Sequence, residues 1–174
     1  LLTPTKVVNA ESTTKINDLI ISEYLEGSSS NKAIELYNGT GETIDLSQYT
    51  LELYSNGSNE PTNPLKLEGT LESGKTYVIV NPSAKAEIKA KANVEHNVTF
   101  FNGDDALVLK KGETVIDSFG QVGVRPDKAW TNNGVSTVDM TLVRKSEIIQ
   151  GDLNIEDEFD PSVEWVALPK DDYS

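Results

Sequence analysis

The sequence predicts an all-β protein, a sandwich of short strands with one short peripheral helix. Apolar and polar residues alternate in many short runs along the 174 residues, as they do in half-buried strands. Turn-forming Gly, Asn, Asp and Ser residues separate these runs. A single stretch has the composition of a helix, which favours a sandwich over an α/β enzyme fold.

The first two strands are expected within residues 18–38. An extended chain places two sets of side chains on opposite sides: Leu19, Ile21, Glu23 and Leu25 on one, and Ile20, Ser22, Tyr24 and Glu26 on the other. Residues 33–37 alternate in the same way. The polar loop 27–32 joins the two runs, so they predict an antiparallel pair. This loop is longer than a tight hairpin requires, which leaves room for contacts of its own.

The later elements follow in order. Further strands are expected at Leu51–Leu53, from Leu65, at Thr76–Val80, at Ala106–Leu109 paired with Thr114–Phe119, at Met140–Lys145 and at Glu164–Leu168. The helix is expected over Ala84–Ala92, capped by Ser83, with Ile88 as its one large apolar residue. The predicted core consists of alternating pairs: Leu19/Ile21, Ile34/Leu36, Leu51/Leu53, Leu107/Leu109 and Val166/Leu168.

Composition limits the function classes. The chain carries 15 Lys and Arg against 28 Asp and Glu, a formal charge of −13 that opposes binding to phosphate backbones. It has no Cys, which excludes disulfides, thiolate metal sites and a Cys nucleophile. No run of apolar residues is long enough for a transmembrane helix. We expect a linker or N-terminal extension at 1–17, one sandwich domain at 18–168 and a C-terminal tail at 169–174.

Several separated motifs resemble the bacterial lamin-tail domain. They are LIISEYLEGSSSNKAIELYNGTGETIDLSQYTL, FFNGDDALVLKKGETVIDSFGQVG, Ala129-Trp130, MTLVRK and FDPSVEW, in the family's order, and the resemblance covers roughly residues 17–168. The resemblance implies an immunoglobulin-like β-sandwich. It also implies an accessory module of a large secreted or surface protein whose other domains include nucleases, phosphoesterases or other hydrolases. Nuclear lamins use the similar domain to bind protein and DNA, but DNA binding is not carried over to this acidic chain.

Four carboxylates in the strands and their turns are candidate functional groups. Glu23 and Glu35 interrupt apolar strands, so one or both are expected to point inward, paired with a cation such as Lys32, Arg125 or Arg144, or bound to a metal. Asp104 and Asp105 follow Asn102-Gly103, where a turn uses Asp to bond its own backbone. A calcium site joining Glu23 or Glu35 to Asp104 or Asp105 is the alternative.

The loop after residue 150 holds the densest acidic cluster. Asp152, Asn154 and Glu156 copy the first three ligand positions of an EF-hand loop, and Asp160 lies nearby. The copy then fails, because Asp157 replaces the required Gly and Val163 replaces the bidentate Glu. A solvated loop is the default interpretation, and weak calcium binding is the alternative.

The aromatic residues and the single histidine have both structural and functional interpretations. Trp165 is expected in the core, whereas Trp130 is either an exposed platform for a glycan or partner, or an anchor for its loop. His96 lies among polar residues without a nucleophile nearby, so it is interpreted as structural.

No catalytic set is visible, so we expect no enzyme activity and no cofactor, with calcium as the one cation that the ligands would suit. Two functions remain: a non-catalytic interaction or spacer module of an extracellular or cell-surface bacterial hydrolase such as a nuclease, and a stand-alone domain for a cell-surface ligand. The expected partners are other domains of the parent chain, or a protein or cell-surface ligand, and not nucleic acid.

Overall fold

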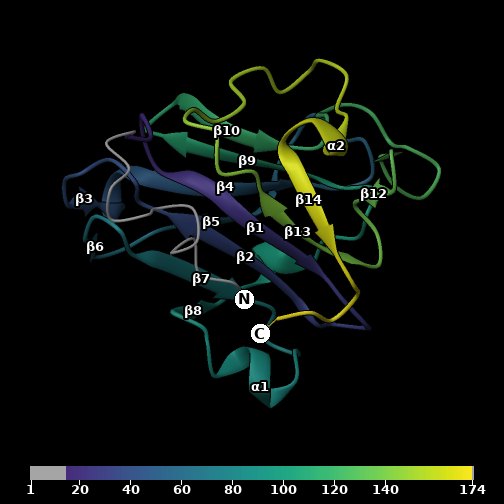
Figure 1. The fold of residues 1–174 in the computed structure, drawn as a ribbon, viewed down its shortest axis with the longest axis horizontal. Helices are drawn as coiled ribbons and strands as arrows, with labels where there is room; N and C mark the ends of the chain where they lie inside the picture. Colours follow the sequence, from purple (N-terminus) through teal and green to yellow (C-terminus); the bar gives the residue numbers. More distant parts are fainter. Residues whose placement is uncertain (1–14, 174) are drawn as a thin grey trace.

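The computed structural model describes residues 15–173, and it confirms the predicted β-sandwich. Two main sheets face each other across a shared core (Figure 1). The six-stranded sheet has the order β14 (Trp165–Leu168), β13 (Met140–Arg144), β1 (Ile20–Glu26), β2 (Lys32–Tyr37), β7 (Thr76–Val80) and β8 (Val94–Glu95). The four-stranded sheet has the order β10 (Thr114–Phe119), β9 (Ala106–Lys111), β4 (Tyr49–Tyr54) and β5 (Thr62–Lys66). Within these two sheets neighbouring strands are antiparallel except β7 and β8.

Small elements complete the described fold. Two short strand pairs are β3 (Ile44–Asp45) with β6 (Thr70–Leu71), and β11 (Thr131–Asn132) with β12 (Val135–Ser136). The helical segments are η2 (Leu46–Gln48), α1 (Ala86–Lys89), η3 (Asn97–Thr99) and α2 (Pro161–Glu164). Within residues 15–173 no helix is long and apolar enough to cross a membrane.

Four of the five predicted pairs of core residues are confirmed. The pairs at 19/21, 34/36, 51/53 and 107/109 are all buried and belong to one cluster between the sheets. The Tyr24 ring stacks between Phe101 and Phe119, with ring centroids 4.8 and 4.1 Å away. Trp165 meets Phe119 edge-on at 5.1 Å, which confirms its predicted core position.

A β-bulge at Ser22 corrects the predicted faces of β1. Ile21 pairs with Leu36 and Glu23 with Glu35, so between these pairs β1 advances by two residues while β2 advances by one. The extra residue reverses the alternation. Tyr24 therefore shares the core face with Leu19 and Ile21, while Leu25 packs in a separate apolar cluster with Val80 and Ile88.

The predicted inward positions of Val166 and Leu168 are wrong. Val166 is 47% exposed, because β14 begins at Trp165 and the inward Trp165 sends the next side chain outward. The segment before β14 forms helix α2, which the prediction of one helix missed. Asp160 caps α2 by accepting a hydrogen bond from the Ser162 N–H, and Pro161 occupies its first turn.

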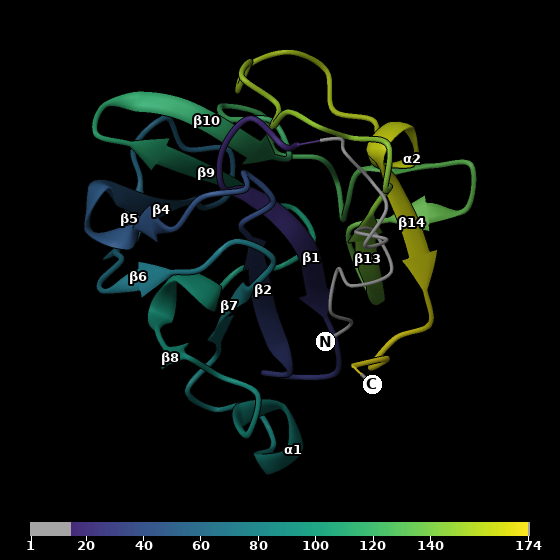
Figure 2. The same cartoon turned by 60° about the vertical axis from the view of Figure 1, so that its left-hand side comes forward.

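The predicted helix is shorter than expected. α1 covers four residues, Ala86–Lys89, and its N-cap is Lys85 in place of Ser83. Ile88, its one large apolar residue, is fully buried. α1 lies at the periphery of the molecule in both views of the fold (Figure 1 and Figure 2).

Candidate functional site

Lys32 holds together three segments at one end of the sandwich. Its ammonium group donates to the Phe101 carbonyl at 2.6 Å and to Asn102 Oδ1 at 2.8 Å, and it pairs with Glu26 Oε1 at 3.3 Å. The other Glu26 oxygen accepts a hydrogen bond from the Asp139 N–H at 2.6 Å. The β1–β2 hairpin is thereby fixed against the loop before β9 and the start of β13.

A polar pocket of about 450 Å³ lies beside Lys32, and we call it the loop-end pocket. Its lining residues are Ser29, Ser30, Lys32, Asn81, Ser83, Phe100 and Asn102. They come from the β1–β2 loop and the start of β2, the segment after β7 and the segment between η3 and β9. None of them carries a carboxylate. Phe100 is 49% exposed, although its neighbours Thr99 and Phe101 are fully buried.

Asp104 and Asp105 lie in the turn before β9, where each has a structural role. Asp105 accepts hydrogen bonds from the N–H groups of Asn56 and Asn102 at 2.8 and 2.7 Å, which fixes two loops together. Burial raises its pKa. Asp104 pairs with Arg125 at 2.9 Å. The bond from the Asn102 N–H to Asp105 is the turn contact that the sequence favours, whereas the Asp104–Arg125 ion pair was not predicted.

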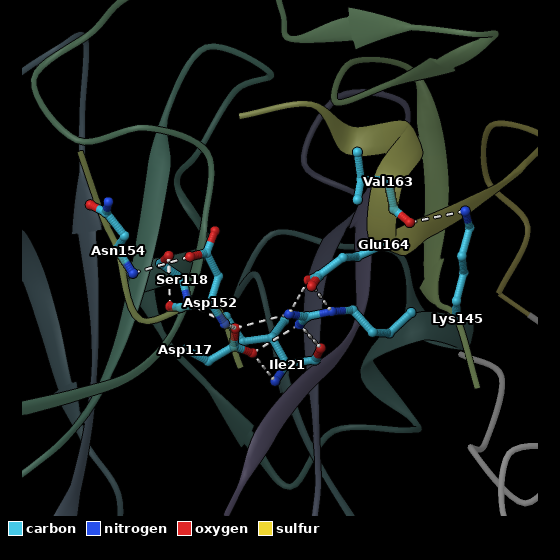
Figure 3. A network of polar contacts seen from close by, with 9 residues as sticks. Ile21, Asp117, Ser118, Lys145, Asp152, Asn154, Val163 and Glu164 are labelled. Atoms are coloured by element: carbon cyan, nitrogen blue, oxygen red, sulfur yellow. Dashed lines mark hydrogen bonds and ion pairs between the residues drawn. The ribbon is translucent and has the colours of Figure 1, made fainter. Parts of the chain in front are cut away.

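A buried ion-pair network joins the two sheets on the side of β10 and β14 (Figure 3). The Arg144 guanidinium binds both Asp117 oxygens, at 2.9 and 3.1 Å, and Glu164 at 2.7 Å. Asp117 also accepts hydrogen bonds from the N–H groups of Ile21, at 2.8 Å, and Asp152, at 2.9 Å. Arg144 and Asp117 are almost wholly buried, so this network is part of the core.

The three basic side chains that the sequence suggested as ion-pair partners all contact carboxylates, but not those of Glu23 or Glu35. Lys32 pairs with Glu26, Arg125 with Asp104, and Arg144 with Asp117 and Glu164. Glu23 and Glu35, the partners that the sequence suggested, face each other across β1 and β2 on the side away from the main core. Glu35 accepts a hydrogen bond from the Ser22 hydroxyl at 2.9 Å. Burial raises the pKa of Glu35 to about 7, although this hydrogen bond acts in the opposite direction.

The acidic loop uses its EF-hand-like spacing to build turns. Asp152 Oδ1 accepts a hydrogen bond from the Asn154 N–H, and Asn154 Oδ1 accepts one from the Glu156 N–H, both at 3.1 Å. Asp160 is occupied by the α2 cap and by Asn132, whose side-chain amide lies 2.7 Å away. Within residues 15–173 no three His, Cys, Asp or Glu side chains gather as metal ligands do.

Trp130 and His96 have structural positions. Trp130 is buried beside Tyr54 and Val122, and it meets Phe159 edge-on at 5.8 Å, so it is not an exposed platform. Its burial pins the long loop before β11 to the four-stranded sheet. His96 caps η3, where its Nδ1 accepts a hydrogen bond from the Val98 N–H at 3.0 Å.

A family model described as Lamin Tail Domain matches residues 12–123, which is more than half of the chain. The chain belongs to the Lamin Tail Domain family. It is therefore a member of a family of non-catalytic, immunoglobulin-like modules. No curated protein and no solved structure matches it. In this lamin tail domain the matched region includes the loop-end pocket and ends before β13 and β14.

The loop-end pocket of this lamin tail domain was not predicted from the sequence. The sequence predicts no role for Phe100, and it places Asn102 in a turn. The sequence did contain an indication of an exposed side chain. The four consecutive residues 98–101, three of them apolar, come directly before a turn, and they cannot all face inward. Which of them faces solvent depends on η3, whose short helical turn the sequence did not predict.

Proposed function

We propose that this lamin tail domain is a non-catalytic interaction module of a larger secreted or cell-surface bacterial protein, and that the parent protein is an extracellular hydrolase such as a nuclease. The observation that best supports this proposal is that its carboxylates already have structural partners. Asp104, Asp105, Asp117 and Asp152 are all engaged in ion pairs or in bonds to backbone N–H groups. A general base needs a lone pair directed at a substrate, and these groups direct theirs at the fold itself.

The net charge supports a partner other than nucleic acid. A formal charge of −13 repels a polyanion at long range, so we propose other domains of the parent chain, or a protein or cell-surface ligand, as partners.

The test compares the parent protein with and without this module. We expect deletion to leave kcat and KM for a small soluble substrate unchanged, while binding of the parent protein to the cell surface or to its macromolecular substrate falls. A matched control replaces the module by an unrelated immunoglobulin-like domain of similar length, which preserves spacing. A large loss of kcat on the small substrate, restored by the module but not by the control domain, would contradict the proposal.

A stand-alone binding domain for a cell-surface ligand is the second candidate. The loop-end pocket favours it, because an exposed Phe100 in a pocket of amides and hydroxyls is typical of ligand sites rather than of spacers. Fluorescently labelled domain, applied to intact bacterial cells, separates the two candidates. Saturable binding by the isolated domain favours the second, and binding that requires the parent chain favours the first.

A further inference from the structure

The loop-end pocket differs in chemistry from the rest of this acidic chain. It is lined by three hydroxyls, two amides, one ammonium group and one phenyl ring. We propose that the loop-end pocket binds a neutral saccharide, with a pyranose ring stacked on Phe100. This inference rests on the proposed interaction function and names the ligand class of that module.

The contacts of Lys32 decide the charge of the ligand. An ammonium group has three protons, and those of Lys32 face the Phe101 carbonyl, Asn102 Oδ1 and the Glu26 carboxylate. No proton remains to bind an anion, and Glu26 neutralises the charge. A cationic ligand is equally disfavoured, because no carboxylate lines the pocket. The pocket therefore suits a ligand that is polar and uncharged.

Phe100 supplies the apolar part of the site. It is the one aromatic residue among the exposed large apolar side chains of residues 15–173. A pyranose ring presents a face of C–H groups, which packs on the electron-rich face of an aromatic ring. Leaving half of a phenyl ring in water is unfavourable, and covering it with such a face recovers that free energy. Phe100 thus takes the role that the sequence suggested for Trp130.

Hydrogen-bonding groups share the pocket with Phe100. Asn102 turns its Oδ1 toward Lys32, so its NH₂ end is directed away from Lys32 and is available to a sugar hydroxyl. Ser29, Ser30 and Ser83, each with a side-chain hydroxyl, also line the pocket. Hydroxyls that act both as donors and as acceptors match the hydroxyls of a sugar.

The pocket is built before a ligand arrives. Ser28 binds the Asp171 carboxylate through its N–H at 2.8 Å and through its hydroxyl, which ties the β1–β2 loop to the C-terminal segment. Asn81 accepts a hydrogen bond from the Ser83 N–H and donates one to the Thr99 carbonyl. Ser29 holds a left-handed backbone with φ of 56°, a conformation that the closed loop imposes. Such pre-organisation reduces the entropy lost on binding.

The test titrates the ¹⁵N-labelled chain with cellotetraose, chitotetraose and maltotetraose, monitored by NMR. We expect at least one of them to shift the amide resonances of residues 28–32, 81–83 and 100–102. The expected Kd is on the order of 10⁻³ M, because an open pocket leaves much of the ligand in solvent. Phe100→Ala should weaken binding about tenfold or more. Val124→Ala is the matched control, since Val124 is 40% exposed and lies outside the pocket.

Three results would overturn the proposal. They are the absence of shifts with all three saccharides, shifts confined to other surfaces, and unchanged affinity in a folded Phe100→Ala variant. Tighter binding of the anion glucuronate than of glucose would contradict the neutral class. A different result would contradict the proposed non-catalytic function: hydrolysis of a saccharide during the titration. Absence of binding to these saccharides leaves the proposed interaction function standing with another ligand.

Discussion

At the scale of single residues, this domain places its charged groups where they organise the backbone. Asp117 binds Arg144 and accepts hydrogen bonds from the N–H groups of Ile21 and Asp152. It therefore connects β10 with β1, β13 and the acidic loop. Removing one partner of such a buried pair leaves the other charge desolvated, which is strongly destabilising.

Asp117→Asn is predicted to lower the free energy of unfolding by about 3–5 kcal/mol, because Arg144 loses its buried counter-charge. Urea denaturation measures the effect. The exposed Asp127 gives the matched control, and Asp127→Asn should change stability by less than about 0.5 kcal/mol. Equal, small losses in the two variants would show that Asp117 and Arg144 are not the buried pair described here.

Glu35 is predicted to make stability depend on pH. Burial raises its pKa from 4.5 to about 7 in the folded state, so the folded chain holds the proton more tightly than the unfolded chain. This contribution to stability is full below the unfolded pKa and is lost as pH rises through about 7.

Comparison with Glu35→Gln isolates this effect. Between about pH 5 and pH 8, wild-type stability should fall by about 2–3 kcal/mol relative to the variant, measured by urea denaturation at each pH. Ser22→Ala is an informative companion, because the Ser22 hydroxyl bonds the Glu35 carboxylate. A difference between wild type and Glu35→Gln that stays constant over this range would exclude a raised Glu35 pKa.

At this scale the sequence was informative for some residues and silent for others. An acidic residue within an apolar strand indicated that Glu23 and Glu35 are buried, and both are. The role of Asp117 was not predictable, since its partners lie 27 and 96 residues away in the chain. Long-range pairing of charges depends on strand order, which local patterns do not contain.

At the scale of elements, alternation of apolar residues located most strands of both sheets. It failed where one residue interrupts the period. The bulge at Ser22 moved Leu25 to the opposite face, and α2 shifted the alternation of β14 so that Trp165 faces inward instead of Val166. The α2 signal was present in the sequence as Asp160 followed by Pro161, a capping residue before a proline at the first helical position.

Truncation of core strands should be costly on both sheets. Ile34→Ala in β2 and Leu107→Ala in β9 are each predicted to lower the free energy of unfolding by about 2–5 kcal/mol, because both side chains are fully buried. Val166→Ala in β14 is the control, with an expected loss below about 0.5 kcal/mol at this exposed site. A loss at Val166 as large as that at Ile34 would mean that the register of β14 is misassigned.

At the scale of the whole molecule, acidic groups are spread over strands, turns and caps. Within residues 15–173 they form no cluster of metal ligands. The carboxylates of the acidic loop instead accept hydrogen bonds from its own N–H groups. We therefore do not expect the high negative charge to create a calcium site.

Calcium at about 10 mM should therefore leave the melting temperature unchanged, measured against magnesium at equal ionic strength. A site with Kd of about 10⁻³ M would add about 1.4 kcal/mol of stability at that concentration. For a domain of this size, that gain corresponds to a rise in Tm of about 3–6 °C. Such a rise with calcium, and its loss in Asp152→Asn, would restore the calcium interpretation of the acidic loop.

The central claim is that this lamin tail domain has no catalytic role of its own. The most direct measurement incubates the purified 174-residue chain with plasmid DNA, RNA and a phosphodiester model substrate in magnesium, manganese or calcium. We predict that all three substrates remain intact, as they do with a buffer control. Cleavage that co-purifies with the folded chain and disappears in Glu23→Gln or Asp104→Asn would contradict this account.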